Sequence, residues 1–526
     1  MSKKKIISAM CLSAALLAGV SSSQTFGATP HYANGEKLLP DQTWSRSWEE
    51  WKEDWPAVAA DYTKVSLAPG KNETELNFAW MSQFQSDGET TPVVLFGENR
   101  ESLREFTGSF EKVDPQLTGE TAYAANKVTV EGLKPNTLYY YAVKRNGKVS
   151  ALRSYRTGDF STAKILFVGD PQIGASKGQQ QGSEKLVATS GAANTAARND
   201  AFGWNRTLSI ASSRHKDLNF IISAGDQVNK TGKPKEEEYA GYLDADLLQY
   251  VPVATTIGNH DSLNLDYRHH FNAPNMTAHG TTTAGGDYYY SYGEGLFIVL
   301  NTNNYNVAEH DLAIAEAVAS DPKAAWRIVT IHQDIYGSGL DHSDTDGMIL
   351  RTQLTPVFDK YDIDVVLQGH DHTYSRSKLL YGDGKTHGSY AFQLSADGSD
   401  YDWDNAFNTV SQTKIPLEPG KDDAAGQKAL AQFQQDNLCY TIEDVRGNTV
   451  RNPKGTLYMS SNSASGSKYY ELIAAQQDYI AKRSQNWLPS YSVIEITPTR
   501  FVIDTYQITD NNDVEKIDET FTIVKE

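Results

Sequence analysis

Short apolar runs, bounded by glycine and polar residues, dominate the chain beyond residue 160. They alternate with stretches that have the spacing of amphipathic helices, such as AEHDLAIAEAVASD at 308–321. Apolar runs of about four to eight residues that alternate with helical stretches are typical of an α/β unit with buried strands. We therefore expect strands at KILFVG (164–169), NFIISAG (219–225), VATTIG (253–258), RIVTIH (327–332) and DVVLQG (364–369).

An all-β pattern precedes this unit, from about residue 65 to residue 157. TELNFAWMS (74–82) alternates as a half-buried strand, and strands, turns and a hairpin follow one another from 126 to 157. Within that stretch, LKPNTLY (133–139) resembles the fibronectin type III pattern, in which a tyrosine, here Tyr139, closes a corner over the sheet edge. We therefore predict an N-terminal all-β sandwich, fibronectin type III-like, followed by an α/β domain.

Two further segments have helical features. Trp44, Trp48, Trp51 and Trp55 recur at intervals of four, three and four, which places them on one face of a helix. We expect this helix to dock on a neighbouring domain. The polar stretch from about 378 to 453 is interpreted as insertions over the body of the α/β domain, partly helical at DDAAGQKALAQFQQD.

The N-terminus has the pattern of a secretory signal peptide. A positive start, Lys3 to Lys5, precedes an apolar stretch that is too short to span a membrane, and the polar segment SSSQTFGA follows it. We expect cleavage between Ser23 and Ala28 and a chain that is secreted or located in the cell envelope. The rest of the sequence contains no apolar stretch with the length of a membrane span.

Composition narrows the function classes. The formal net charge is −18 and becomes about −21 without the lysines of the signal, so the exported chain lacks the basic excess that nucleic-acid binding needs. Only Cys439 remains once Cys11 is removed, which excludes an intrachain disulfide. The predicted domains are a signal peptide at 1–28, an N-terminal extension at 29–62, the β-sandwich at 63–158, and the α/β domain at 162–526 with an insertion at about 378–453.

Potential metal ligands follow every one of the predicted strands of the α/β domain. They are Asp170 and Gln172 in GDPQ, Asp226 and Asn229 in GDQVN, Asn259, His260 and Asp261 in GNHD, His332 in TIH, and His370 and His372 in GHDH. Ligands gather beyond the carboxyl ends of the strands in open α/β sheets, so these side chains are expected to meet. Each motif alone is an ordinary loop, but the whole series indicates a site.

The kinds of side chain indicate which metals the site holds. Asp, Asn and His without cysteine suit divalent Mn, Fe or Zn and exclude a thiolate zinc site. The ligands exceed the needs of one tetrahedral ion, so two metal ions about 3.5–4 Å apart are expected. Alternation along the strand is expected to turn Asp371 away from the metals. Asp261 is expected to orient His260 or its loop.

The ordered series GDxx, GDxxN, GNHD, xxxH and GHxH resembles the calcineurin-like metallophosphoesterase superfamily, and with the β-sandwich in front of it the chain is similar to the purple acid phosphatase branch. The resemblance implies a catalytic domain of two mixed β-sheets flanked by helices, in α/β/β/α layers. It also implies a ligand set: Asp170 and His372 on a first metal, Asp226 as the bridge, and Asn259, His332 and His370 on a second metal.

The same resemblance implies a reaction and its catalytic residues. A hydroxide held by the metals attacks phosphorus, while an imidazolium assists the leaving alkoxide. His260 matches the histidine beside the substrate phosphate, and His342 matches a further histidine outside the metal shell. Asn259 is also expected to contact the substrate, as is Tyr336, which flanks the pocket loop.

Two positions depart from the purple acid phosphatase pattern. Asn229 stands where that branch carries the tyrosine whose bond to ferric iron gives the purple colour, so we expect divalent metals and a colourless or weakly coloured protein. Gln172 stands where that branch usually has glycine and many members of the wider superfamily have histidine. Its side-chain oxygen either binds the first metal or forms a hydrogen bond within the metal shell.

These features favour a secreted phosphohydrolase with two metal ions that cleaves phosphomonoesters of small molecules. A phosphodiesterase or nucleotide hydrolase would use the same fold. A hypothesis of another class is a non-catalytic cell-envelope protein whose β-sandwich binds a wall polymer. Neither nucleic acid as a structural partner nor a membrane span is expected, and the oligomeric state stays open.

The other histidines are expected outside the site. His269 and His270 are interpreted as part of a surface helix end or turn. The remaining ones are interpreted as solvated side chains in polar surroundings: His31, His215, His279, His310 and His387.

Overall fold

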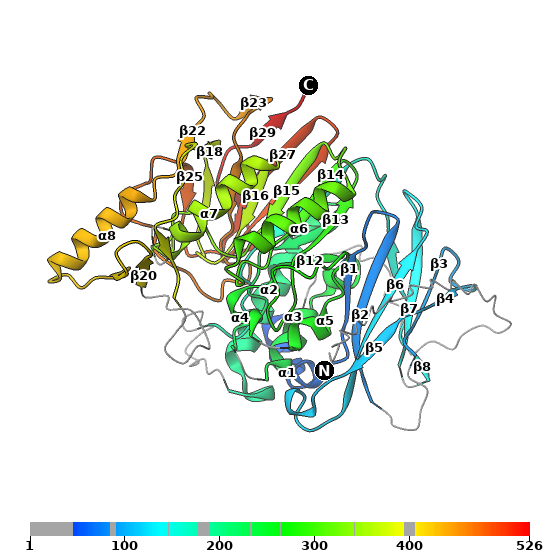
Figure 1. Ribbon diagram of the computed structural model, residues 1–526. Helices are drawn as coiled ribbons and strands as arrows, with labels where there is room; N and C mark the ends of the chain where they lie inside the picture. Colours follow the sequence, from blue (N-terminus) through cyan, green and yellow to red (C-terminus); the bar gives the residue numbers. More distant parts are fainter. Residues whose placement is uncertain are drawn as a thin grey trace, which may run out of the picture.

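A computed structural model describes the chain at residues 46–84, 91–145, 147–176, 189–231, 234–263, 265–340, 342–343, 345–393 and 405–526. The predicted signal peptide, His31 and Trp44 lie outside these residues. Figure 1 shows a β-sandwich, in blue and cyan, beside a larger α/β unit. The described helices include none with the length and apolar character of a membrane span.

The helices cover the outside of the α/β unit. In the described residues they are α1 (Trp48–Ala60), α2 (Thr195–Arg214), α3 (Glu236–Leu243), α4 (Asn259–Ser262), α5 (Asp266–His270), α6 (Val307–Ser320), α7 (Asp346–Lys360) and α8 (Ala424–Asp436), with 3-10 turns at Pro115–Leu117, Gly191–Ala193 and Asp246–Gln249. Helix α1 confirms the tryptophan spacing. Ser47 caps it by accepting a hydrogen bond from the Glu50 N–H, and buried Trp51 and Trp55 pack it against α2 and α3.

The sandwich packs two antiparallel sheets face to face. One has the order β1 (Val65–Pro69), β2 (Glu75–Gln83), β6 (Tyr123–Glu131), β5 (Ser109–Lys112); the other has β4 (Arg104–Thr107), β3 (Val93–Gly97), β7 (Leu138–Arg145), β8 (Lys148–Val149), with β9 (Arg153–Arg156) on β7. Phe78, Phe96 and Tyr141 are buried between the sheets. The Tyr139 hydroxyl accepts a hydrogen bond of 2.7 Å from the Lys134 N–H, which is the corner contact that the sequence predicts.

The α/β unit contains two larger mixed sheets. The first has the order β12 (Val253–Thr255), β11 (Phe220–Ser223), β10 (Ala163–Val168), β26 (Ser490–Thr497), β27 (Arg500–Ile508), β29 (Phe521–Val524), β23 (Thr449–Arg451), with β28 (Val514–Lys516) on β27. The second has the order β13 (Tyr288–Tyr292), β14 (Gly295–Val299), β15 (Trp326–Thr330), β16 (Val365–Gln368), β24 (Leu457–Ser460), β17 (Tyr374–Ser377), β25 (Ile480–Ser484). All the predicted strands are present.

The two large sheets stack on each other and are covered by helices outside. Phe167 and Leu367 lie in the apolar layer between the sheets, whereas their chain neighbours Leu166 and Val366 point outward to the helices. On the outer side of the first sheet, Leu166 shares a cluster with Trp204 of α2. Strands that are buried on both faces are apolar throughout, which is why these runs do not alternate. The arrangement confirms the predicted α/β/β/α layers.

The predicted strands that carry ligands are divided between the two sheets. β10, β11 and β12 are neighbours in the first sheet, and β15 and β16 are neighbours in the second. Their carboxyl ends nevertheless lie together. This is shown by the His370 N–H after β16, which donates hydrogen bonds of 3.0 Å to both carboxylate oxygens of Asp170 after β10. The loops of two stacked sheets, and not of one open sheet, therefore build the site.

The chain between β17 and β24 forms small structures of its own. They are the strand pair β18 (Leu380–Gly382) and β22 (Tyr440–Ile442), the sheet β19 (Tyr390–Ala391), β20 (Asn405–Asn408), β21 (Thr413–Pro416), and α8. In Figure 1, α8 and β20 lie on the side of the α/β unit opposite the sandwich. The helix predicted at 422–436 is confirmed by α8, whose Phe433 is buried.

Candidate metal centre

Five of the predicted ligands have a left-handed backbone. Their φ angles are 47° for Asp170, 37° for Gln172, 50° for Asp226, 70° for His370 and 47° for His372. Such angles are uncommon for residues other than glycine and cluster at functional sites. Each strand thus ends before its ligand, and the chain turns sharply to direct the side chain inward.

Glycine precedes the ligands because neighbouring ligands need the space. A Cβ atom at Gly225, whose φ is 113°, would lie inside van der Waals contact with the His332 ring. A Cβ at Gly258 would overlap the carboxylate of Asp226 in the same way. The recurring GD, GN and GH dipeptides are therefore a consequence of how closely the strand ends converge.

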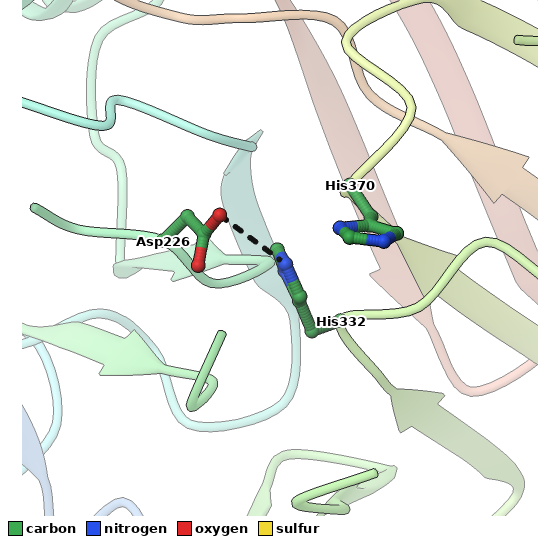
Figure 2. Close-up of side chains that lie close together, drawn as sticks. All are labelled: Asp226, His332 and His370. Atoms are coloured by element: carbon green, nitrogen blue, oxygen red, sulfur yellow. Dashed lines mark ion pairs between the residues drawn. The ribbon is translucent and has the colours of Figure 1, made fainter. Parts of the chain in front are cut away.

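Asp226, His332 and His370 form one part of the centre (Figure 2). One ligand atom from each lies within 4.8 Å of the others, and all three residues are buried. The His332 Nδ1–H donates a hydrogen bond of 2.9 Å to the Ala224 carbonyl, so in the neutral ring Nε2 carries the lone pair. Nε2 lies 3.0 Å from Asn259 Oδ1 and 3.5 Å from Asp226 Oδ2, so three electron-donating atoms face one another.

Asp170 and His372 form the other part. The His372 Nδ1–H donates a hydrogen bond of 2.9 Å to the Lys468 carbonyl, and Nε2 lies 3.6 Å from Asp170 Oδ1. This repeats the arrangement at His332: a backbone carbonyl fixes the tautomer, and the second nitrogen faces a carboxylate. The structure therefore brings together Asp170, Asp226, Asn259, His332, His370 and His372.

The donor atoms fit divalent cations. His370 Nε2 and Gln172 Oε1 are buried, and within the described residues neither has a hydrogen-bond partner. Buried polar atoms without a partner are rare, and at a site like this one they indicate an ion. Carboxylate, amide and imidazole donors without thiolate suit Mn, Fe or Zn.

The carboxyl groups of Asp170 and Asp226 share the same buried surroundings, which shift their pKa values in opposite directions. Burial raises the pKa of Asp170 to about 8, with the nearby Asp226 carboxylate acting in the same direction and His332 against it. Burial would also raise the pKa of Asp226, but His332 and His260 hold it well below its usual range. Two adjacent buried carboxyl groups cannot both ionise without a positive charge between them, and metal ions would supply it.

The imidazoles respond to the same surroundings. Burial disfavours the charged form of His332, yet Asp226 and Asp170 raise its pKa to about 9. Burial, with Lys468 acting in the same direction, lowers the pKa of His372 to about 3. Burial, His342 and His332 hold the pKa of His370 well below its ordinary value. His370 and His372 are therefore neutral, which is the state that a metal ligand requires.

His260 and His342 adjoin the centre, and both are half-buried. The His260 N–H donates a hydrogen bond of 2.9 Å to Asp226 Oδ1, and its Nδ1–H donates to the Asn229 carbonyl. The ring of His342 stacks on that of His370. The two histidines are thus anchored to predicted ligands of the second metal.

Gln172 and Asn229 lie at the edge of the centre. The Gln172 N–H donates a hydrogen bond of 2.8 Å to the Asp226 carbonyl, and its amide nitrogen lies 3.4 Å from Asn229 Oδ1. The Asn229 N–H donates to Glu238 Oε2 at 2.9 Å. Both side chains are therefore beside Asp226, and metal binding by either stays a prediction.

Tyr336 is not part of the site, so its assignment as a substrate contact is wrong. Its side chain is fully buried, its ring packs against Tyr458 and Tyr479, and its hydroxyl lies within hydrogen-bond distance of Thr355 and Cys439. The residue follows a ligand-bearing strand, but its side chain turns into the core beneath α7.

Two acidic neighbours of the ligands orient loops. Asp371 is turned away from the centre, as expected, and its carboxylate accepts hydrogen bonds from the Gly339 N–H and the Ser343 hydroxyl. The expected reason, alternation along a strand, is wrong, because the residues on either side of Asp371 have left-handed φ angles. Asp261 accepts hydrogen bonds from the N–H groups of Gly258 and Gln227, and thus fixes the loop that carries His260.

Three other histidines are buried, contrary to expectation. His270 Nε2 lies 2.8 Å from Glu236 Oε2, and His269 Nε2 lies 3.0 Å from Glu111 Oε1. His310 bridges Asp287 Oδ2 and the Asn304 carbonyl, each at 2.7 Å. The carboxylate partners of all three come from distant parts of the chain, so the polar residues around these histidines in the sequence do not determine their exposure.

Three further residues lie at the centre that no pattern in the sequence predicts: Lys468, Tyr470 and Gln485. Lys468 contributes positive charge to Asp170, His370 and His372 and bonds to His372 through its carbonyl. The Tyr470 ring lies edge-on to His372 and His342, with centroids 5.4 Å and 5.8 Å away. Their segment has no periodic pattern and joins the site from far along the chain, so only two consecutive tyrosines beside a lysine could have drawn attention to it.

Comparisons with known proteins agree with this geometry. Residues 163–374 match the family model of the calcineurin-like phosphoesterases, and residues 62–157 match that of the purple acid phosphatase N-terminal domain. Purple acid phosphatase 21 of Arabidopsis thaliana is 24% identical over 309 residues, which cover 54% of this chain and 62% of the relative. An uncharacterized protein of Mycobacterium tuberculosis is 22% identical over 349 residues, which cover 60% of this chain and 62% of the relative. The chain thus spans less than two thirds of the length of either relative.

Two solved structures share the fold. A purple acid phosphatase from yellow lupin (Lupinus luteus) seeds superimposes with a TM-score of 0.57 at 14% identity, covering 89% of this chain and 74% of the other. A structure of PhoD superimposes with a TM-score of 0.51 at 12% identity, covering 89% of this chain and 91% of the other. The chain therefore contains a purple acid phosphatase N-terminal domain at residues 62–157 and a calcineurin-like phosphoesterase domain at residues 163–374.

Proposed function

We propose that this protein is a secreted, metal-dependent hydrolase of phosphomonoesters. The observation that carries the proposal is the convergence of Asp226, Asn259, His332 and His370 with Asp170 and His372 on one buried space. A non-catalytic envelope protein would not need this set of buried donors. Secretion is supported by the signal-peptide pattern at the N-terminus.

Two metal positions are proposed. Asp170 and His372 would hold the first metal, with Gln172 beside them, and Asp226 would bridge the two ions. Asn259, His332 and His370 would hold the second. When bound, the metals would supply Lewis-acid stabilisation of the phosphoryl oxygens and an activated water for in-line displacement.

His260 is proposed to contact the substrate phosphate. Because its Nδ1–H is engaged by the Asn229 carbonyl, Nε2 is the nitrogen left to face the substrate. The hydrogen bond from its backbone to Asp226 keeps the ring at a fixed position relative to the bridging carboxylate. His260 therefore donates a hydrogen bond to a phosphoryl oxygen when the ring is protonated, and His342 protonates the leaving oxygen.

Metal analysis and a substrate panel test the proposal. The protein, loaded with Mn, Fe or Zn, is expected to hold two metal ions and to hydrolyse aryl and alkyl phosphomonoesters faster than phosphodiesters. Asp226→Asn should lose metal and activity. Asp362→Asn is the matched control, since Asp362 has a similar φ of 49° and a side chain that is 92% exposed. No bound metal together with no turnover would reject the proposal, and faster cleavage of diesters would correct the substrate class.

A further inference from the structure

An exposed tryptophan lies near the metal centre. Trp487 is 54% exposed, and its backbone has a φ of 59°, which a bulky side chain rarely adopts. Its ring lies edge-on to Tyr469, with centroids 6.0 Å apart and planes at 79°. Backbone conformations of this kind cluster at functional sites, which makes this exposed ring a candidate for ligand binding.

Trp487 is connected to the metal centre through two consecutive tyrosines, the first of which contacts its ring. Tyr470 follows Tyr469 in the chain, and its ring lies edge-on to His372 and His342 at the centre. We call Tyr469, Tyr470 and Trp487 the aromatic ridge. The ridge extends from two histidines of the proposed reaction site to the surface of the protein.

Gln485 fixes the ridge to the centre. Its amide nitrogen donates hydrogen bonds of 2.8 Å to the His372 carbonyl and 2.7 Å to the Tyr470 carbonyl. Its amide oxygen accepts one of 3.1 Å from the Trp487 N–H. A single side chain thus connects the loop of a proposed metal ligand with both ends of the ridge, so the position of Trp487 relative to the centre is preorganised.

The ridge also has a positive charge beside it. The Lys468 ammonium lies 4.4 Å from the centroid of the Tyr470 ring, and its charge reaches Asp170, His370 and His372. A ligand on the ridge would therefore have aromatic surface at one end and positive charge at the other. That pattern matches an anionic phosphate attached to a planar ring.

We propose that the aromatic ridge is a subsite for the base of a nucleoside phosphate whose phosphate occupies the metal centre. The proposal rests on the proposed phosphoester hydrolysis and specifies its substrate class. Aromatic side chains stack on any base because every base has a π face, and such stacking changes affinity by about five- to 150-fold. Trp487 and Tyr469 are then residues that determine specificity for the organic part of the substrate.

Paired substrates test the subsite. In the metal-loaded protein, kcat/KM for adenosine 5′-monophosphate is expected to fall about tenfold in Trp487→Ala and to stay within about twofold of wild type in Trp487→Phe. Glycerol 2-phosphate, which has no ring, should be hydrolysed equally by all three. Leu312→Ala is the matched control, because Leu312 is similarly exposed, at 56%, but lies on α6.

The outcomes separate the subsite from the proposed function. Equal losses for both substrates, or no loss for either, would overturn the subsite while leaving phosphoester hydrolysis in place. If the wild type hydrolysed neither substrate, the proposed function would fail. Tryptophan fluorescence would then test the subsite alone: adenosine monophosphate should quench the wild type more than Trp487→Phe, and equal quenching would overturn it.

Discussion

The ring of His342 stacks on that of His370, with centroids 3.8 Å apart and planes at 28°. Burial and His342 both keep His370 unprotonated. His342 is half-buried whereas His370 is buried, so His342 is the more accessible ring of the pair and the one assigned to carry a proton to the substrate. The stack thus joins a proposed metal ligand to a proposed acid.

Replacement of His342 should separate these two roles. We expect His342→Asn to lower kcat by about 10²- to 10⁴-fold, because a positioned acid contributes that much, while the metal content stays unchanged. Steady-state kinetics and elemental analysis measure the two effects. His387→Asn, remote in sequence and in the 378–453 segment, is the control. Unchanged kcat, or loss of metal with loss of activity, would argue against an acid role.

Gly225 offers a test of the crowded strand ends. Gly225→Ala should abolish metal binding and lower the free energy of unfolding, because the added Cβ would displace His332 and alanine disfavours a φ of 113°. Gly388→Ala is the matched control, since nothing lies within 4 Å of a Cβ there. Metal titration and urea denaturation report the two quantities. Normal metal affinity in Gly225→Ala would contradict the role given to this glycine.

The strand ends show how much of the site can be predicted from the sequence. Asp226, His332 and His370 could be predicted together because each follows a buried apolar run and carboxyl ends of such strands converge. The left-handed turns could not, since they arise from contacts between loops of two sheets. The expected role of Tyr336 is wrong because proximity to His332 in the chain does not determine which way a side chain turns after the strand.

Partners that are distant in the sequence could not be predicted. Lys468 lies almost a hundred residues after His372 in an aperiodic segment, and its carbonyl contact with His372 brings it to the centre. His310 looked solvated because its neighbours in sequence are polar, but Asp287 and the Asn304 carbonyl satisfy both ring nitrogens in the core. The strand pattern fixes which loops meet, whereas these partners depend on side-chain geometry.

Lys468 should strengthen phosphate binding. We expect Lys468→Met to raise KM for phosphomonoesters and the inhibition constant of inorganic phosphate by about three- to tenfold, because a nearby positive charge is lost. Lys454→Met is the matched control: its ammonium also lies over a tyrosine ring, at 3.9 Å from the Tyr381 centroid. Equal inhibition constants for wild type and Lys468→Met would place the ammonium outside the phosphate site.

The colour of the protein tests the metals. With Asn229 in place of the tyrosine of the purple branch, the as-isolated protein should show no strong visible absorption band, whereas Asn229→Tyr loaded with ferric iron should show one. Absorption spectra with metal analysis measure this. A strong band in the wild type would mean that another residue supplies the chromophore.

Metal removal should make stability fall at alkaline pH. In the metal-free centre the pKa of Asp170 is raised to about 8 by burial with Asp226, and that of His332 to about 9 by Asp226 and Asp170 against burial. Both groups hold protons in the folded state that the unfolded chain releases. Their contribution to the free energy of unfolding is therefore lost as the pH rises through these two pKa values. His370 and His372, whose pKa values are lowered, contribute no slope above about pH 6.5.

Between about pH 6.5 and 9, the free energy of unfolding of the chelated protein should therefore decline, by at most about 1.4 kcal/mol per pH unit for each of the two groups. Bound metal keeps both ligands deprotonated in the folded state, so the metal-loaded protein should lack this decline. Urea denaturation of both forms at several pH values measures the difference in their free energies of unfolding. Titratable groups elsewhere in the chain contribute equally to both forms and cancel in this difference. The metal-loaded and chelated forms should differ more in free energy of unfolding as the pH rises toward 9. If this difference stays constant or decreases, Asp170 and His332 do not share the metal centre.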